Sequence, residues 1–151
     1  MTNSTFSNVG SVSGGDGLDT SGSTLTISDS YFNEARDKAI SAGENSHLTL
    51  NNITIENSNI ALVSKDRSEV TAHDIRIDNI KEYALMSYTK KPIFGSANLN
   101  VTKIQCQPLS CVEKSLVELG SALSIDGVSV SSEEVNVKAL YQGIMKSDKP
   151  K

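Results

Sequence analysis

The sequence of 151 residues is poor in aromatic side chains: it has no tryptophan, four tyrosines and three phenylalanines. Because hydrophobic residues still make up 37% of the chain, the composition argues against a core of large rings and favours stacked Val, Ile and Leu. A chain of this length can bury the core of one ordinary domain. No apolar run is long enough to cross a bilayer, and no basic start leads into an apolar stretch. The sequence therefore predicts neither a membrane span nor a signal peptide.

Basic charge is scarce as well. The chain has 14 Lys and Arg residues against 18 Asp and Glu residues, which gives a formal net charge of -4. Proteins that bind nucleic acid concentrate basic side chains in order to displace the counterions of the phosphates. The sequence contains no such patch, so we expect no nucleic-acid partner.

Cysteine is limited to Cys106 and Cys111, which enclose a Pro-containing segment. Two interpretations remain open. The thiols are free, with one of them in the core, or they form a short disulfide across a turn, which would imply an oxidising compartment. A zinc site is not expected, because the two histidines, His47 and His73, lie far away in sequence and no second cysteine pair exists.

What the sequence does contain is a repeat. The alternation of apolar and polar residues over positions 24–32 returns over positions 47–55 and again over positions 69–77, after shifts of 23 and then 22 residues. A repeat of this length, built from short strands, predicts a solenoid in which each turn, or rung, stacks on the one before it.

Four columns of matched positions extend the pattern through five rungs. They are Leu25, Leu48, Val70, Leu99 and Leu123; Ile27, Leu50, Ala72, Val101 and Ile125; Ser30, Ile53, Ile75, Ile104 and Val128; and Phe32, Ile55, Ile77, Cys106 and Val130. One extra residue between the second and third columns lets the chain turn a corner while both pairs stay inward. Asp29, Asn52 and Asp74 lie at this corner, where we expect their side chains to accept backbone hydrogen bonds and to stack.

A third strand follows the corner in each rung, over positions 38–42, 59–63, 83–86 and 115–119. Three short strands per turn are typical of a parallel β-helix, so the predicted fold class is an all-β, single-stranded parallel solenoid. Its six rungs span positions 1–23, 24–46, 47–68, 69–97, 98–121 and 122–141. The domain therefore covers residues 1–145, and residues 146–151 form a polar tail.

The ends of the solenoid and one insertion complete the prediction. Phe6 is expected to match Phe32 in the irregular first rung, and Leu18 to match Ile40. We expect the insertion at residues 88–95 to protrude as a loop, and residues 135–145 to cover the last open rung. No amphipathic cap precedes the first rung. The chain is thus expected to be the C-terminal part of a longer protein, and to self-associate through the uncapped N-terminal rung.

A glycine-rich acidic motif provides the first functional candidate. Gly14-Gly15-Asp16-Gly17-Leu18-Asp19 is followed one rung later by Asp37, Lys38 and a small apolar run. These residues resemble the pectate-lyase-like superfamily of right-handed β-helix proteins, and locally the polygalacturonase-type glycosidases, which carry Asn-Thr-Asp-Gly-x-Asp, then Asp-Asp, Gly-His-Gly and Arg-x-Lys. The chain departs from that pattern: Lys38 replaces the second Asp, Asn59-Ile60-Ala61 stands in place of Gly-His-Gly, and Arg-x-Lys is missing.

The resemblance implies Asp16, Asp37 and Lys38 as candidate catalytic residues of a degenerate glycoside hydrolase. Glycoside hydrolysis needs an acid and a base that face one bond, and Lys38 would favour the charged form of nearby carboxyls. Acid-sugar lyases of this fold instead pair acidic calcium ligands with a basic side chain. Under that alternative Asp16, Asp19 and Asp37 would bind calcium, beside Lys38, Lys65 or Arg67. Otherwise these are turn residues in a mixed-charge ladder.

Aromatic and basic side chains in the insertion suggest a ligand contact, because sugar rings bind aromatic faces with adjacent donors. The candidates are Tyr88, Lys90, Lys91 and Phe94, with Lys65 and Arg67 in the preceding rung.

Residues 14–141 also resemble bacterial right-handed β-helix regions of large surface or secreted proteins, some of which lie beside spore-coat-kinase-like domains. This resemblance implies an extracytoplasmic location. We therefore expect a non-catalytic scaffold or a module that contacts polysaccharide. A polysaccharide lyase or glycoside hydrolase and a structural stalk or adhesin segment are the alternatives, because one fold hosts many functions.

Overall fold

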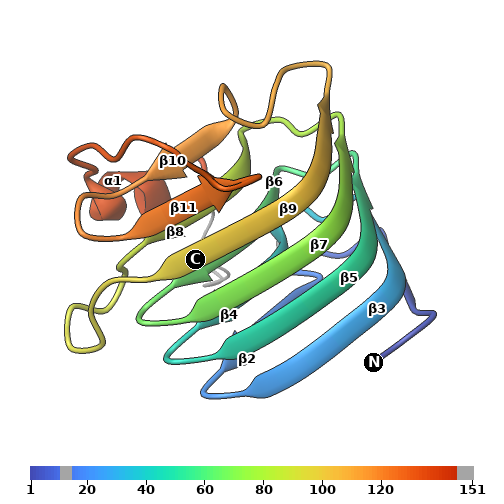
Figure 1. Ribbon diagram of the computed structural model, residues 1–151, viewed down its shortest axis with the longest axis horizontal. Helices are drawn as coiled ribbons and strands as arrows, with labels where there is room; N and C mark the ends of the chain where they lie inside the picture. The colour runs from blue at the N-terminus through green and yellow to red at the C-terminus, as the bar shows by residue number, and fades with distance from the viewer. Residues whose placement is uncertain (11–14, 146–151) are drawn as a thin grey trace.

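The computed structural model describes residues 1–10 and 15–145, and shows two sheets that face each other along one solenoid axis (Figure 1). The long sheet has seven strands in the order β1-β3-β5-β7-β9-β11-β12, and the short sheet has five in the order β10-β8-β6-β4-β2. From β1 to β11, successive strands alternate between the sheets over about five turns. The polar tail at residues 146–151 and Gly14 lie outside the described residues. No helix in the described part is long and apolar enough to cross a membrane.

The strands of the long sheet are β1 (Thr5–Ser7), β3 (Thr24–Asn33), β5 (His47–Glu56), β7 (Glu69–Asp78), β9 (Asn98–Gln107), β11 (Ala122–Ile125) and β12 (Val128–Ser129). Those of the short sheet are β2 (Leu18–Ser21), β4 (Lys38–Gly43), β6 (Ile60–Lys65), β8 (Tyr83–Tyr88) and β10 (Ser115–Val117). One short helix, α1 (Val137–Gln142), follows.

The register of the parallel strands confirms the predicted columns through β9. Leu48 pairs with Leu25 on one side and with Val70 on the other, and Val70 pairs in turn with Leu99 across the insertion. Phe6 pairs with Phe32, and their rings stack with centroids 4.7 Å apart. Because like positions stack at spacings of about 4.8 Å, the inward Ile, Leu, Val and Phe side chains form one continuous core.

The corner in each long strand is made by one residue in the left-handed region: Asp29 (φ 52°), Asn52 (φ 55°), Asp74 (φ 60°) and Lys103 (φ 53°). Asn and Asp tolerate this conformation better than most residues. Pairing resumes directly after the corner, so the two predicted strands form one bent strand of ten residues. The corner side chains also stack, because Asn52 Nδ2 donates to Asp29 Oδ1 at 2.8 Å.

The last rung is incomplete, which corrects the prediction for Val128. After β11 the chain reverses at Asp126 (φ 49°) and Gly127 (φ 81°), and β12 pairs antiparallel with β11. Val128 is therefore 70% exposed rather than inward. An Asp-Gly pair is a strong signal for a tight hairpin, and here it outweighs the repeat.

Residues 135–145, which we call the C-terminal strap, do not cover the end of the solenoid as predicted. They lie against the outer face of the short sheet, where α1 is seen in Figure 1. The physical reason is that this face is apolar. The strap contributes Val135, Val137, Leu140, Tyr141, Ile144 and Met145, which pack against Ile60, Val63, Tyr83, Met86, Tyr88 and Leu116.

The prediction that Tyr88 belongs to the protruding insertion is wrong. Tyr88 ends β8 with 1% of its surface exposed, so it does not belong to the protruding loop. The loop comprises residues 89–97.

Cys106 and Cys111 are joined by a disulfide, with Cys106 in β9 and Cys111 buried against the core. The sequence left two interpretations open, free thiols or a disulfide, and the structure shows the disulfide. It ties the segment that follows β9 back to that strand.

Candidate functional site

The outer face of the short sheet changes character along the solenoid axis. Over β6, β8 and β10 it is apolar and covered by the C-terminal strap. Toward β2 and β4 it carries five charged side chains, which we call the acid–lysine cluster. Its members are Asp16, Asp19, Asp37, Lys38 and Lys65. Parallel pairing brings them together, because β2, β4 and β6 are neighbours in the sheet.

Lys38 lies between the two carboxylates that the sequence proposed as a catalytic pair. Its Nζ is 2.6 Å from Asp37 Oδ2 and 3.7 Å from Asp16 Oδ1, while its backbone N–H donates to Asp16 Oδ1 at 3.1 Å. Lys38 is only 3% exposed. Asp16 and Asp37 do lie close together, as the rung spacing predicted, but both face one ammonium group.

Burial and neighbouring charges shift the pKa values of Asp16 and Lys38. Burial raises the pKa of Asp16 from 3.8 to about 6, although Lys38 pulls it down, and the negative charge of Asp37 adds to the rise. Burial opposes the charge on Lys38, but the carboxylates of Asp16 and Asp37 more than offset that effect and raise the pKa of Lys38. The site therefore combines a carboxyl group that titrates near pH 6 with a lysine that stays charged.

Lys65, at the end of β6, reaches across β4 toward β2. Its Nζ donates to Ser41 Oγ at 2.9 Å and lies 3.7 Å from Asp19 Oδ1. A Cβ at Gly43 would lie 2.8 Å from Lys65 Cε, so a larger residue at position 43 would displace the Lys65 side chain from this path. Burial lowers the pKa of Lys65, against the opposing pull of Asp19.

Tyrosines from β8 and the strap border the cluster. The Tyr141 ring has Lys90 Nζ 4.3 Å from its centroid and Lys38 Nζ 5.3 Å away, both within the range of cation–π attraction. The Tyr88 and Tyr141 hydroxyls are hydrogen-bonded at 2.7 Å, and burial raises the pKa of both tyrosines. Sequence reasoning missed Tyr141, because no local pattern places the strap over the short sheet.

The three aspartates proposed as calcium ligands are divided between the two lysines. Asp16 and Asp37 face Lys38, whereas Asp19 faces Lys65. Among residues 1–10 and 15–145 no group of three or more His, Cys, Asp or Glu side chains is arranged to hold a metal ion. Calcium binding stays a prediction. It would require a cation to compete with two ammonium groups, or to use the buried Asp37 Oδ1, which has no hydrogen-bond partner in the described part of the chain.

The loop of residues 89–97 is held in place by hydrogen bonds at its base. Asp66 Oδ1 accepts the backbone N–H groups of Lys90 and Lys91, each at 2.7 Å, and Glu118 Oε1 accepts that of Thr89 at 2.8 Å. The N–H of Arg67 donates to the carbonyl of Gly95 at 3.1 Å, which joins the loop to the preceding turn.

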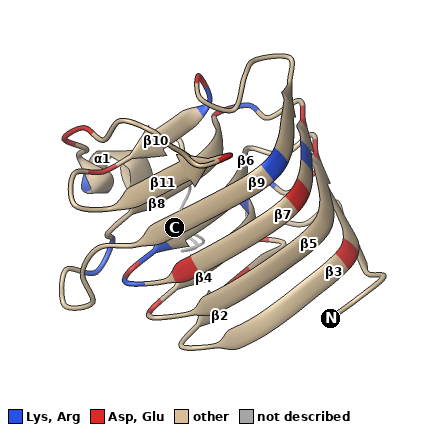
Figure 2. Cartoon of the chain, in the orientation of Figure 1, with Lys and Arg blue, Asp and Glu red and all other residues tan. Residues whose placement is uncertain are grey.

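The side chains that this loop presents are cationic and apolar. Lys90 and Lys91 are exposed, as is Arg67 in the turn beside the loop, and Ile93 is 90% exposed at the tip. Phe94 is half-buried, and Lys91 pairs with Glu44. Figure 2 shows basic residues on this loop. Four of the predicted ligand-binding residues therefore lie together: Arg67, Lys90, Lys91 and Phe94. The other two are buried, Lys65 within the acid–lysine cluster and Tyr88 beside it.

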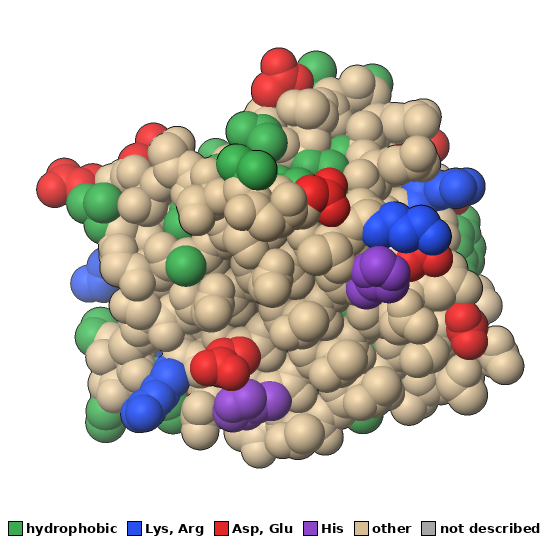
Figure 3. Space-filling view, viewed as in Figure 1, with side chains coloured by type: hydrophobic (Ala, Val, Ile, Leu, Met, Phe, Trp, Pro, Cys, Tyr) green, Lys and Arg blue, Asp and Glu red, His purple; other side chains and the backbone are tan. Residues whose placement is uncertain are grey.

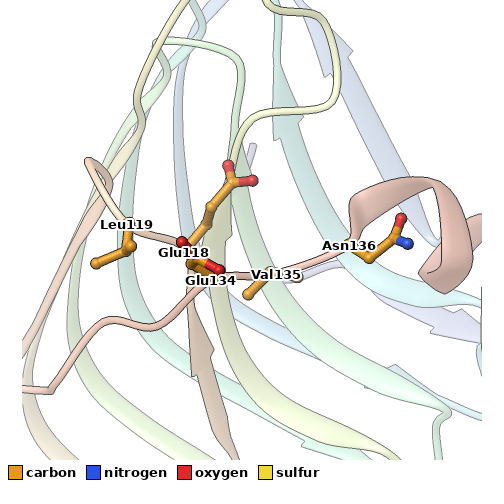
Figure 4. Close-up of a pocket in the computed structure, with 5 residues that line it drawn as sticks. All are labelled: Glu118, Leu119, Glu134, Val135 and Asn136. Carbon is orange, nitrogen blue, oxygen red and sulfur yellow. The ribbon is translucent and has the colours of Figure 1, made fainter.

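Two other surfaces are less distinctive. The outer face of the long sheet is mostly uncharged and polar, with a few small groups of charged and His side chains (Figure 3). Among them, His47 lies beside Glu69 and Lys103 beside Asp74. A surface hollow of about 510 Å³ lies where the chain enters the strap, lined by Glu118, Leu119, Glu134, Val135 and Asn136 (Figure 4). Glu118 already supports the loop, so this hollow adds no separate set of chemical groups.

The two parallel sheets, wound from alternate strands, define the chain as a β-solenoid. The family described as "Right handed beta helix region" matches residues 1–107. The match covers more than half of the chain, and the protein therefore belongs to this right-handed β-helix family, as the resemblance implied. Neither the curated proteins nor the solved structures gave a match. The family establishes the fold, and one fold supports many activities.

Proposed function

We propose that this β-helix is a non-catalytic scaffold, part of a larger surface or secreted protein, that contacts acidic polysaccharide through the loop of residues 89–97 and the adjacent turn at Arg67. The observation that supports this proposal is the anchoring of the loop by Asp66, which binds two consecutive backbone N–H groups. A loop that is already ordered loses little conformational entropy when it binds a ligand.

The chemistry of the loop favours an acidic sugar polymer. Lys90, Lys91 and Arg67 offer ammonium and guanidinium donors, which form charge-assisted hydrogen bonds with the carboxylates of uronic acids. Ile93 and Phe94 add apolar surface beside these charges. A neutral polysaccharide would use only the apolar part of this surface, so we expect it to bind more weakly.

The test is calorimetric titration with acidic and neutral oligosaccharides of equal length, with and without calcium. The double variant Arg67→Ala/Lys90→Ala should weaken binding of the acidic ligand at least tenfold, which corresponds to about 1.4 kcal/mol. Lys103→Ala is the matched control, because Lys103 is an exposed lysine on the long sheet. Equal binding by the double variant would contradict the proposed site. Failure of the unaltered chain to bind either ligand would favour a structural stalk.

A polysaccharide lyase or glycoside hydrolase is the second candidate, and one observation favours it. Asp16, with a pKa near 6, lies beside Asp37, so one carboxyl could donate a proton while the other accepts one. Lys38, whose ammonium group lies between these two carboxyl groups, counts against the enzymatic function. Incubation with acidic polysaccharides at pH 5 to 7, followed by assays for new reducing ends and for unsaturated uronates, would reveal either activity. Product that is lost in Asp37→Asn would replace the binding proposal with the enzymatic one.

A further inference from the structure

The C-terminal strap is attached to the β-helix by side chains rather than by strand pairing. Within the described residues, its backbone hydrogen bonds join strap residues to one another, except that the carbonyl of Ile144 accepts a bond from Asn59 Nδ2 at 2.9 Å. The Tyr88 hydroxyl, which is hydrogen-bonded to that of Tyr141, also lies 3.7 Å from Met145 Sδ. The helix of the strap, α1, has six residues, too few to be stable by itself. The strap can therefore leave the sheet without breaking a rung of the solenoid.

Tyr141 links the strap to two lysines from different parts of the molecule. Lys38 Nζ of the acid–lysine cluster lies 5.3 Å from the ring centroid, and Lys90 Nζ of the loop lies 4.3 Å from it. Lys38 is a fixed neighbour, because it is buried and its Nζ is 2.6 Å from Asp37 Oδ2. The ring thus rests on a buried ion pair and in turn holds the exposed Lys90, on the side of the short sheet where α1 lies (Figure 1).

The Lys90 side chain is held at both ends. Its backbone N–H donates to Asp66 Oδ1 at 2.7 Å, and its ammonium group faces the Tyr141 ring. A lysine side chain loses much conformational entropy when it is fixed, and cation–π attraction offsets part of that loss before a ligand arrives. The neighbouring Lys91 differs, because its ammonium group is paired with Glu44. Lys90 is fixed by a neutral ring, which leaves its charge available to an acidic ligand.

We infer that Tyr141 is a positioning residue for Lys90, and that docking of the strap and binding of an acidic sugar polymer strengthen each other. Such coupling rests on the proposed function, since it concerns the same loop. With the strap docked, the ammonium group of Lys90 is already placed for a uronate, whereas with the strap released it must be ordered on binding. Because coupling between two binding equilibria is reciprocal, the ligand must hold the strap down as strongly as the strap improves binding.

Two variants that both lack the hydroxyl separate the ring from the rest of the side chain. Tyr141→Phe keeps an aromatic face toward Lys90, whereas Tyr141→Leu keeps only apolar bulk. In a titration with an oligomer of galacturonic acid, Tyr141→Phe should change the affinity by less than about twofold, and Tyr141→Leu should weaken it about fivefold. The methyl-esterified oligomer carries no carboxylate, so both variants should bind it equally.

Hydrogen exchange in α1 provides a second readout. Without ligand, Lys90→Ala should speed exchange in α1, and Lys91→Ala, the matched control, should not, because Lys91 pairs with Glu44 rather than with the ring. A saturating amount of the galacturonic acid oligomer should slow this exchange about fivefold in the unaltered chain and in Tyr141→Phe. It should not slow it in Tyr141→Leu.

The possible failures are distinguishable. Equal affinities of Tyr141→Phe and Tyr141→Leu for the acidic oligomer would overturn the coupling and leave the loop as the binding site. Tighter binding by Tyr141→Leu would overturn it as well, since the strap would then compete with the ligand. No binding by the unaltered chain would overturn the proposed function together with the coupling. Circular dichroism checks that each variant is folded, and Tyr141→Met replaces Tyr141→Leu if that variant is not.

Discussion

The two sheets of this β-helix share one core, but the outer face of the long sheet is exposed and that of the short sheet is covered. In β5 and β7 exposed and buried residues alternate, whereas all six residues of β4 and of β6 are buried. The long sheet therefore meets water, as an amphipathic sheet does, and the short sheet is sandwiched between the core and other groups. The difference shows that the distinctive chemistry of the chain, both the acid–lysine cluster and the strap, belongs to the short sheet.

The largest effect should come from placing a charge on the covered face. Val63→Asp buries an unpaired carboxylate under the strap and should lower the free energy of unfolding by about 3–5 kcal/mol. Thr49→Asp, on the exposed face of the long sheet, should change it by less than about 0.5 kcal/mol. Urea denaturation measures both variants. Equal effects would show that the strap does not cover the short sheet in solution.

A cavity in the shared core should cost somewhat less. Ile53 is buried between Ser30 and Ile75 in one inward column, so Ile53→Ala should lower the free energy of unfolding by about 2–5 kcal/mol. Thr49→Ser on the same strand is the conservative control. A loss below about 1 kcal/mol for Ile53→Ala would be incompatible with this column of the core.

The acid–lysine cluster should make stability depend on pH. Since the pKa of Asp16 is raised from 3.8 to about 6, the folded state binds more protons than the unfolded state between these values. Stability should therefore fall as pH rises through this window, by on the order of 1–3 kcal/mol. In Asp16→Asn that contribution is absent. Denaturation curves at several pH values should show a flatter profile for the variant, and parallel profiles would contradict the assignment.

The smallest effect concerns the attachment of the strap. Tyr141→Phe removes the hydroxyl that is hydrogen-bonded to Tyr88 but keeps the ring beside Lys90 and Lys38. We expect a loss of about 1 kcal/mol in the free energy of unfolding. Hydrogen exchange should become faster in α1 than it is in the unaltered protein, and should stay the same in β5. Tyr31→Phe is the matched control on the long sheet, where the hydroxyl donates to Glu56 at 2.7 Å. Exchange in α1 that matches the unaltered protein would mean that the tyrosine pair does not hold the strap.

Most of the solenoid could be predicted from the sequence because parallel, in-register pairing repeats the same inward positions in every rung. The matches of Leu25 with Leu48 and of Phe6 with Phe32 follow directly from that rule. The rule failed where the chain leaves the repeat. The Asp126-Gly127 hairpin signal was present but was overridden by the apparent column through Val128, which the structure shows to be exposed.

The candidate site was predictable in part. Rung spacing placed Asp16 beside Asp37 and Lys38, and the structure brings them together. Spacing cannot show that Lys38 turns its ammonium group between the two carboxylates, because this depends on rotamers and on burial. The position of Tyr141 depends on packing between segments distant in sequence. The nearly continuous apolar runs in β6 and β8 were nevertheless a usable signal, since a strand buried on both faces needs a second covering layer.

The loop of residues 89–97 also shows how this architecture tolerates added sequence. It lengthens one turn of the helix, yet Val70 and Leu99 on either side of it remain paired in register. The hydrogen bonds that the backbone N–H groups of the loop donate to Asp66 and Glu118 close its base, so its tip contributes little to the pairing of the strands. A foreign peptide grafted in place of Pro92-Ile93 should therefore be displayed without loss of the fold, which makes this turn a natural point for diversification and for engineering.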